Sequence, residues 1–357
     1  MPAPDSSPDA LGLRDTPGIR DTLGIRETVL GLPEQIESAM AAIGRIEGLP
    51  EPARVDNVLL LGMGDSGFGG DVAAASARSF SSVPIVVYNG YLPPSWVGPN
   101  TLVIALSNSG TTEETLESLE AAIESGASLL AVTGGGELEA LARRAHGSVV
   151  HVESDAVMPR TILGLLAVPP MLALEQIGLF PGARAWLSEA VAVLRERRDE
   201  ILGANNPAAA VAERIGRTVP VIYGGGTIGT TAAKRWKVAY NHNAKAPAFW
   251  APMPELCHNE LVGWGGDPAA TRDLFTQVQL RHDAEHPQTS FRFEFVRSVT
   301  VDSMNDVIEV VAKGDGPVAQ LLDLIFMGDL VSLEAAAARG IDPGPLPEVE
   351  ALKTWVG

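Results

Sequence analysis

The stretch VDNVLLLGMGDSGFGGDV, residues 55–72, decides the fold expected for this chain. The apolar run 57–63 is typical of a buried β-strand, and a helical pattern follows it over 69–80. Between them, the glycines of GMGDSG reproduce the spacing G-x-G-x-x-G, which occurs where a strand turns into a helix whose N-terminus receives a phosphate. This stretch therefore predicts a strand–turn–helix unit of the α/β class.

The glycine turn lacks the acidic residue that a dinucleotide site requires. That residue stands about 20 positions later, at the end of the second strand, and binds the ribose hydroxyls. Here the second strand-like run ends in Tyr88, Asn89 and Gly90, with no carboxylate. The segment also lacks the G-x-S-x-G pattern of a hydrolase nucleophile elbow. We therefore expect neither NAD binding nor serine hydrolysis at this turn.

Length, charge and cysteine content narrow the class of protein. A chain of 357 residues with 46% apolar content is long enough for two cores. The formal charge of −18 opposes binding to nucleic acid or to an anionic membrane. A single cysteine, Cys257, excludes internal disulfides and suits a reducing compartment. With no long apolar run and no signal peptide, we expect a cytoplasmic protein.

Strand and helix patterns alternate twice along the chain. This alternation indicates parallel sheets covered by helices on both faces, and hence two doubly wound α/β domains in tandem. In the first half the strand-like runs are 57–63, 84–90, 101–107, 127–133 and 147–152, with helical patterns at 69–80, 112–125 and 137–145. In the second half the strands are 219–226, 275–281 and 305–313, and the helices are 227–245 and 317–340.

The predicted domain plan has four parts. They are a flexible N-terminal tail (1–31), a first domain (32–155), a helical linker region (156–215) and a second domain with a C-terminal helix (216–357). The tail contains a hexapeptide repeat, LGLRDT, PGIRDT and LGIRET. Three such copies are too few and too polar to form a solenoid core, so we expect a tail with only a short helix near its end.

A second loop favours an anion site. Residues 107–115 read SNSGTTEET and follow the strand 101–107 at the start of a helix. Ser109 and Thr112 can donate O–H groups to phosphate oxygens, and Gly110 lets the backbone approach closely. The common alternative is an N-cap with a capping box, and both roles can hold together. Four hydroxyl residues within six positions exceed what a cap needs, so we predict a phosphate site.

Six motifs occur in order along the chain. They are GMGDSGFGGD (62–71), SNSGTTEET (107–115), Pro159-Arg160, NAKAPAFWAPMPELCHNELVGW (243–264), IDPGP (341–345) and Leu352-Lys353. Together they resemble the bifunctional phosphoglucose/phosphomannose isomerases, which are built from sugar isomerase (SIS) domains, and the resemblance covers the chain from about Leu32. It implies two tandem SIS domains, each a doubly wound parallel sheet flanked by helices, in a metal- and cofactor-independent homodimer.

The resemblance implies an intramolecular oxidoreductase that interconverts glucose, mannose and fructose 6-phosphates through an enediolate. By the same resemblance, Arg160 would steady the enediolate, and His258 would open the sugar ring, often from a partner subunit. The phosphate ligands would be Ser107, Ser109, Gly110 and Thr112, and the sugar ligands Gly64, Asp65, Ser66, Glu255 and Lys353.

The proton-abstracting base departs from the resembled pattern. The family reads N-E-N-A-K with a catalytic glutamate, whereas this chain reads NHNAK with His242 in its place. Asp65 also replaces the family's usual glycine. Three interpretations follow: His242 is the base; Asp65 supplies a carboxylate or the chemistry differs; or the chain is a sugar-phosphate-binding or regulatory protein without turnover. We predict an isomerase with His242, His258 and Arg160 as catalytic residues, and keep the non-catalytic binding protein as the alternative.

The remaining histidines and the cysteine favour no further chemistry. His282 and His286 have the i, i+4 spacing of metal ligands, but their segment is polar, and we expect a solvated loop or helix face. Cys257 and His258 are adjacent on a segment expected to be extended, where neighbouring side chains point apart. We expect neither a metal site nor a Cys–His nucleophile.

Overall fold

The computed structural model describes residues 20–153 and 158–356, without the side chains of Lys353, Thr354 and Val356. The chain divides into two compact units. Unit 2 is Leu32–Ala192, and unit 1 combines Met1–Gly31 with Val193–Gly357. Residues 1–19 of the predicted tail lie outside the described residues, and the predicted domain boundaries stay predictions.

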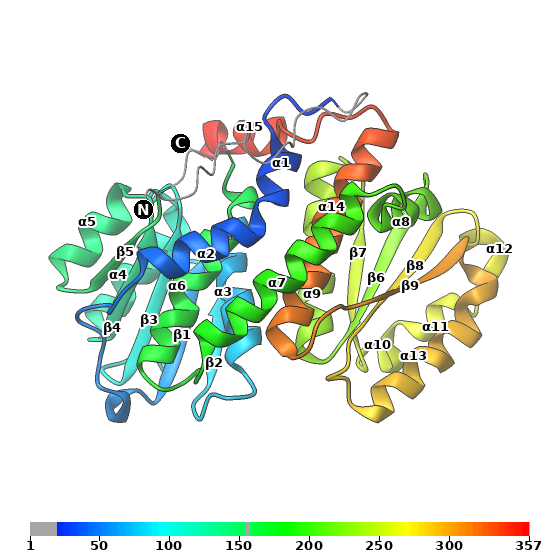
Figure 1. Cartoon of the computed structure of the whole chain (residues 1–357). Helices are drawn as coiled ribbons and strands as arrows, with labels where there is room; N and C mark the ends of the chain where they lie inside the picture. Colours follow the sequence, from blue (N-terminus) through cyan, green and yellow to red (C-terminus); the bar gives the residue numbers. More distant parts are fainter. Residues whose placement is uncertain (1–19, 154–157, 357) are drawn as a thin grey trace. The chain divides into compact units, whose positions relative to one another are not determined.

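Unit 2 contains a five-stranded parallel sheet, sheet A, in the order β2-β1-β3-β4-β5. Leu60 in the centre of β1 pairs with Val87 on one side and Ile104 on the other. The strands are apolar in continuous runs because helices cover both faces (Figure 1). Their bounds are β1 (Asn57–Gly62), β2 (Ile85–Tyr88), β3 (Thr101–Ser107), β4 (Ser128–Thr133) and β5 (Ser148–His151).

Two helical layers bury the faces of sheet A. One core joins Leu59, Val103 and Leu129 of the strands to Leu119 and Leu138 of helices α4 and α5. Helices α3 and α6 pack against each other and contact the sheet. The elements are α2 (Leu32–Ala42), η2 (Pro52–Arg54), α3 (Gly64–Ala77), α4 (Glu113–Glu124), α5 (Gly136–Arg144), η3 (Pro159–Thr161) and α6 (Leu163–Gln176); α7 (Ala183–Leu202) runs across the boundary between the units.

Unit 1 contains a four-stranded parallel sheet, sheet B, in the order β7-β6-β8-β9. Its strands are β6 (Val219–Gly225), β7 (Phe249–Met253), β8 (Phe275–Arg281) and β9 (Asp306–Val311). Its helices are α1 (Ile25–Leu30), α8 (Pro207–Ile215), α9 (Gly226–Asn243), α10 (Leu256–Asn259), α11 (Leu261–Trp264), α12 (Pro268–Thr271), α13 (Pro287–Thr300), η4 (Val301–Ser303), α14 (Pro317–Ala338) and α15 (Pro347–Val356).

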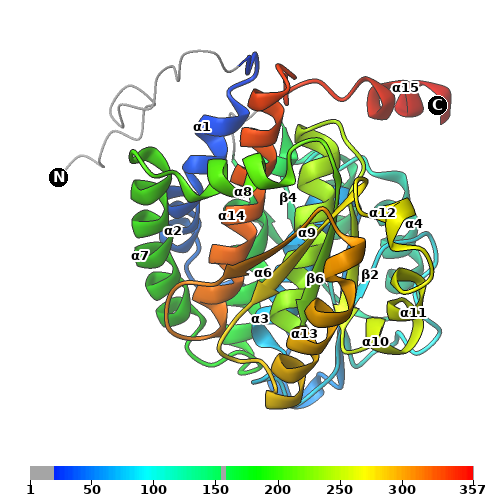
Figure 2. The same ribbon diagram turned by 90° about the vertical axis from the view of Figure 1, so that its right-hand side faces the viewer.

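Helix α14 is a core element of unit 1. It packs along α9 and α8, and α1 lies beside it in both views (Figures 1 and 2). Asp323 and Asp329 are buried on it, each within 2.7 Å of a guanidinium, that of Arg197 and Arg235 respectively. Buried carboxylates require such partners, and these two fasten α14 to α7 and α9.

The prediction of two parallel sheets flanked by helices is confirmed. The helix expected from residue 69 begins at Gly64 instead, because the glycines lie in its first turns. Strand β7 is not among the predicted strands, and it carries Pro252 at the sheet edge, where proline is tolerated. None of the helices in the described part of the chain is long and apolar enough to cross a membrane.

Candidate functional site

The order of sheet A places a topological switch point between β1 and β3. Chain connections leave these two strands in opposite directions, and ligands of open α/β sheets bind at such a switch point, beyond the carboxyl ends of the strands. Gly62 at the end of β1 is in register with Leu106 of β3. The glycine turn and the hydroxyl loop, residues 107–112, therefore start side by side.

The glycine turn is held by close backbone packing. A Cβ on Gly67 would lie 2.5 Å from the carbonyl oxygen of Gly62, so only glycine fits there. The side-chain amide of Asn89, at the end of β2, donates a hydrogen bond to the same carbonyl oxygen. The sequence gives no signal for this structural role of Asn89, because the role depends on strand pairing. Asp65 and Ser66 follow in the first turn of α3, half-buried.

The hydroxyl loop gathers the predicted phosphate ligands. The hydroxyl of Ser107 shares a 2.9 Å hydrogen bond with that of Thr112 and accepts one of 3.2 Å from the backbone N–H of Gly110. Ser109 is exposed and Thr112 half-buried, so the loop is open at its surface. The amide of Asn108 donates to the hydroxyl of Ser66 at 3.2 Å, which joins this loop to the glycine turn.

Thr112 is the N-cap residue of α4, but the capping-box alternative is wrong. Its side chain makes no cap hydrogen bond, because its hydroxyl faces Ser107 instead. The first N–H groups of a helix have no partner within the helix, and here no cap side chain satisfies them. Hydroxyl donors thus stand beside N–H groups at the positive end of a 12-residue helix, a suitable setting for a phosphate.

The backbone of the hydroxyl loop is braced from behind. Gly110 has φ +65°, and a Cβ there would collide with the carbonyl oxygen of Gly135. The backbone N–H of Gly134 donates to the carbonyl of Asn108 at 3.0 Å, and the backbone N–H of Leu138 donates to the carbonyl of Gly110 at 2.9 Å. The loop is therefore positioned before any ligand binds, which lowers the entropy that binding must remove.

Arg160 lies in η3 and is buried, and η3 packs against α3, the helix that opens at the glycine turn. Gln35 anchors the neighbouring backbone by donating to the carbonyl of Thr161 at 2.7 Å. Unit 2 thus brings together seven of the predicted residues at one sheet edge and places Arg160 against the adjoining helix. The seven are Gly64, Asp65, Ser66, Ser107, Ser109, Gly110 and Thr112.

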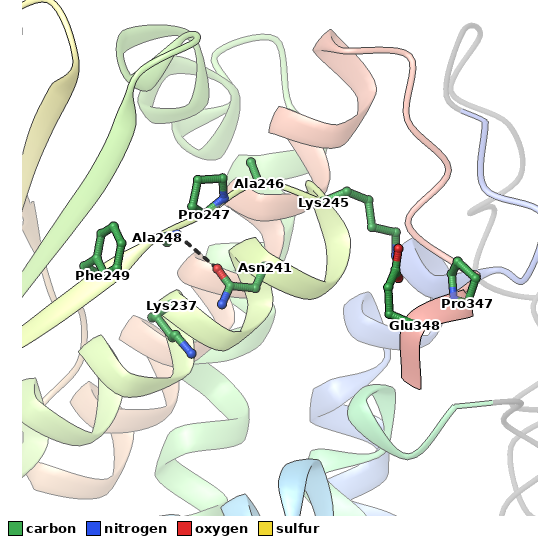
Figure 3. Close-up of a pocket in the computed structure, with 9 residues that line it drawn as sticks. All are labelled: Lys237, Asn241, Lys245, Ala246, Pro247, Ala248, Phe249, Pro347 and Glu348. Atoms are coloured by element: carbon green, nitrogen blue, oxygen red, sulfur yellow. Dashed lines mark hydrogen bonds between the residues drawn. The ribbon is translucent and has the colours of Figure 1, made fainter. Parts of the chain in front are cut away.

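In unit 1, His242 lies in the last turn of α9. Because α9 starts at the carboxyl end of β6 and runs back, its last turn lies at the amino end of sheet B. The amide of Ala248, just before β7, donates to Asn241 at 3.0 Å, and the ammonium of Lys245 donates to the carbonyls of His242 and Pro343. A pocket of about 560 Å³ adjoins this turn (Figure 3), lined by Lys237, Asn241, Lys245, Ala246, Pro247, Ala248, Phe249, Pro347 and Glu348.

His258 and Glu255 lie at the opposite end of sheet B. Both are exposed and follow the carboxyl end of β7, Glu255 as the N-cap residue of α10 and His258 within it. Five residues of strand separate the ends of β7 by about 15 Å. Unit 1 therefore does not bring His242 and His258 together. Cys257 is helical rather than extended, which corrects our expectation, and burial raises the pKa of its thiol, contrary to an activated nucleophile.

A hydrogen-bonded cluster anchors the segment that carries His258. The phenol of buried Tyr223 donates to Glu260, and the indole N–H of Trp264 donates to Tyr223 at 2.9 Å and to Glu260 at 3.2 Å. Burial and the Glu260 carboxylate raise the pKa of Tyr223, which keeps it a donor. The spacing of Glu260 and Trp264 within one motif is visible in the sequence, but Tyr223 lies 37 residues earlier in the chain and carries no signal.

The expectation of a solvated 282–286 segment is wrong for His282. Its ring is buried, and Nε2 donates to the carbonyl of Gly225 at 2.9 Å. His286 is exposed and caps α13 by accepting from the amide of Gln288 at 3.1 Å. Among the residues that the structure describes, no group of three or more His, Cys, Asp or Glu could hold a metal ion. The side chain of Lys353, a predicted sugar ligand, lies outside the described residues.

Both units match known protein families. Residues 53–164 match the SIS domain, and residues 204–356 match the bacterial phospho-glucose isomerase C-terminal SIS domain. A solved structure, the C-terminal domain of glucosamine-fructose-6-phosphate aminotransferase from Francisella tularensis, shares the fold with a TM-score of 0.68 at 14% identity. It aligns over 91% of this chain and 98% of that one.

Two curated relatives carry the name bifunctional phosphoglucose/phosphomannose isomerase. The protein from Caldicellulosiruptor bescii is 31% identical, over 91% of this chain and 97% of its own. The protein from Aquifex aeolicus is also 31% identical, over 83% of this chain and 89% of its own. The chain therefore belongs to the bifunctional phosphoglucose/phosphomannose isomerase family.

Proposed function

We propose that this protein is an aldose–ketose isomerase that interconverts glucose, mannose and fructose 6-phosphates without a metal or cofactor. The observation that carries the proposal is the open hydroxyl loop at the switch point of sheet A, joined to the glycine turn by the bond between Asn108 and Ser66. Its family membership supports the same class of substrate.

The phosphate would be bound by local donors. The net charge of −18 gives no general attraction for an anion, so affinity depends on the hydroxyls of Ser107, Ser109 and Thr112 and on N–H groups at the start of α4. Gly110 would contribute to phosphate affinity because, without a side chain, it lets the loop backbone approach the ligand closely. Asp65, a carboxylate beside the loop, would oppose the phosphate and face sugar hydroxyls instead.

We assign proton transfer between carbons to His242. As a neutral imidazole it would remove the proton from C2 of the open-chain aldose, leave an enediolate, and return the proton to C1 of the ketose. The imidazolium formed in between lies at the C-terminal end of α9, where the helix dipole favours positive charge. Arg160 would stabilise the enediolate oxygen, because a guanidinium stays charged throughout.

We assign ring opening to His258, which would move a proton from the anomeric hydroxyl to the ring oxygen. Because His258 and His242 lie at opposite ends of sheet B, a second copy of the chain is the natural source of His258 at a given site. The proposed enzyme is accordingly a homodimer with shared sites.

A substrate that cannot form a ring separates the two histidine roles. A tetrose 4-phosphate has no free hydroxyl with which to close a five- or six-membered ring, so its isomerisation needs no ring opening. His258→Ala should lose about 10²-fold or more in kcat on glucose 6-phosphate yet keep the tetrose reaction. His242→Ala should lose about 10² to 10⁴-fold on both substrates.

His151→Ala is the matched control, since this exposed histidine lies in unit 2 at the end of β5, and it should leave both rates unchanged. If His242→Glu keeps the activity that His242→Ala loses, the side chain at position 242 acts as the base. Wild-type protein that binds glucose 6-phosphate by calorimetry but converts neither substrate would overturn the proposal and favour the non-catalytic binding protein.

A further inference from the structure

The hexapeptide repeat of the N-terminal tail plays no part in the proposed chemistry. Its copies, residues 11–16, 17–22 and 23–28, share the pattern Leu/Pro-Gly-Leu/Ile-Arg-Asp/Glu-Thr. The structure describes the third copy and the last three residues of the second, and both belong to unit 1. The contacts of the third copy reveal what the repeated residues are for.

The third copy binds the C-terminal part of α14 through Ile25 and Arg26. Ile25 is fully buried, and the guanidinium of Arg26 lies 2.6 Å from the carboxylate of Glu334. Both charged side chains are largely buried, 13% and 14% exposed, so the pair is shielded from salt and solvent. Gly24 precedes α1 with φ +64°, a conformation that explains the glycine of the repeat.

The segment after α14 completes the contact. Leu23 packs against Gly344, where a Cβ would lie 2.8 Å from the leucine side chain. Thr22 donates its hydroxyl to the carboxylate of Asp342 at 2.6 Å, and Asp342 also accepts from the amide of Gly344 at 2.9 Å. Burial alone would raise the pKa of Asp342, but these hydrogen bonds outweigh it and hold the pKa below its usual value. We call Glu334, Asp342 and Gly344 the tail-binding site.

Every residue of the tail that contacts the tail-binding site in the structure has an equivalent six positions earlier. Leu23, Gly24, Ile25 and Arg26 correspond to Pro17, Gly18, Ile19 and Arg20. Asp21, which accepts from the amides of Ile25 and Arg26, corresponds to Asp15, and Thr22 corresponds to Thr16. Arg20 is meanwhile 74% exposed and only 4.0 Å from Asp342, so the second copy's arginine is accessible beside the site.

We propose that the tail-binding site accepts the second copy, Pro17–Thr22, in exchange for the third within the same chain. The tether keeps the second copy at high effective concentration. Six further residues enter the connection to Leu32, which costs little entropy because closure entropy grows slowly with length. The third copy is preferred because Val29 and Leu30 follow it and are buried, whereas Leu23 and Gly24 follow the second.

The exchange protects the turn that carries His242. The ammonium of Lys245 donates to Pro343, which lies between Asp342 and Gly344 of the tail-binding site, and also to the carbonyl of His242. Figure 3 shows Lys245 reaching from the end of α9 toward Glu348 of α15. A filled site, with either copy, fixes the 342–344 backbone and through Lys245 the last turn of α9.

Disulfide trapping tests the exchange without any activity measurement. In a Cys257→Ser background, Glu334→Cys is combined with Arg26→Cys, Arg20→Cys or, as an out-of-register control, Asp15→Cys. In the structure Arg26 contacts Glu334 and Arg20 lies beside Asp342, so residue 20 takes the place opposite residue 334 on exchange. A disulfide requires Cα atoms within about 7 Å, and the 26–334 pair is the positive control for that geometry. We expect intramolecular disulfides for the first two pairs and none for the control, by non-reducing mass spectrometry. A 26–334 bond without a 20–334 bond, or a 20–334 bond only between chains, would overturn the proposal.

Thermal unfolding of arginine variants gives a second measurement. Arg20→Ala should leave Tm unchanged, and Arg26→Ala should lower it by about 5 °C, since the largely buried carboxylate of Glu334 loses its cation and keeps the side-chain amide of Asn206, at 2.8 Å, as a donor. The double variant should lose clearly more than the sum, because the replacement copy is also disabled. Equal Tm values for Arg26→Ala and the double variant would exclude exchange.

Discussion

The two sheets of this molecule each have a switch point with a strand, a glycine turn and a helix, but only one is open. In sheet A the turn of β1 faces the hydroxyl loop, and Ser109 there is exposed. In sheet B the turn of β6 is filled: a Cβ on Gly225 would lie 2.7 Å from Thr289 and 3.1 Å from Phe293, both of α13. His282 closes it further by donating to the carbonyl of Gly225.

Glycines therefore specify the turn and not its ligand. Both turns need glycine because strand and helix backbones approach closely. The residues after the neighbouring strand decide whether a ligand site remains. Hydroxyl residues after β3 leave the loop open at its surface, whereas buried His282 and helix α13 after β8 fill the equivalent place with packed side chains. Substitutions at each switch point can therefore test this contrast.

The largest effect is expected from Gly110→Ala in the open switch point. The new Cβ would collide with the carbonyl oxygen of Gly135, a backbone atom that cannot turn aside, so the loop itself must move. A displacement of about 1 Å at a binding loop costs about 10²-fold in rate. We expect kcat/KM for glucose 6-phosphate to fall by about that factor or more.

Gly126→Ala is the matched control for backbone strain. Gly126 ends the turn after α4 with φ +78°, but a Cβ there meets only Pro99, at 3.6 Å. It should cost about 1 kcal/mol of stability and leave kcat/KM unchanged. Equal losses of kcat/KM in the two variants would mean that strain, and not loop position, governs the site.

A smaller effect on activity, together with a large loss of stability, is expected from Phe293→Ala in the closed switch point. Phe293 is fully buried against Gly225 in the core of unit 1, and its removal should lower the free energy of unfolding by about 3–5 kcal/mol. The exposed Phe295 on the same helix gives a control, and Phe295→Ala should change stability little. Because the proposed phosphate ligands belong to sheet A and a tetrose 4-phosphate needs no ring opening by His258, KM for that substrate should stay constant in both variants. A rise in KM confined to Phe293→Ala would contradict the contrast between the two sheets.

The sequence predicts local features of the fold well and paired features poorly. Ser107 and Thr112 can be placed in one loop from the sequence, because strand, loop and helix are contiguous in the chain. Asn89 cannot, because its bond to Gly62 exists only once β2 pairs with β1. Helix α13 escapes prediction because Phe291 and Phe295 are exposed while Phe293 and Val296 are buried, so its apolar residues do not follow one face. The separation of His242 from His258 likewise requires the strand order.

The smallest effect concerns an ion pair at the edge of sheet B. Arg214 of α8 donates two hydrogen bonds, 2.7 and 2.9 Å long, to the carboxylate of Asp306 at the start of β9. These hydrogen bonds lower the pKa of Asp306 in the folded protein. The stability that the ion pair contributes is therefore fully present above the pKa that Asp306 has in the unfolded chain, and it is lost as pH falls through the lower pKa of the folded protein. Because both side chains are about one-third to one-half exposed, Asp306→Asn should cost only about 0.5–1 kcal/mol at neutral pH.

That loss should shrink as acid titrates the wild-type carboxylate, so the two stability curves should converge in urea titrations as pH falls below the usual pKa of an aspartate. Asp302→Asn is the control, since this carboxylate is 84% exposed and 3.8 Å from Arg272, and it should match wild type throughout. KM for glucose 6-phosphate should be the same in all three proteins, because the open switch point belongs to sheet A. A difference between Asp306→Asn and wild type that persists after the wild-type carboxylate has been protonated would mean that packing, and not charge, holds this edge of sheet B.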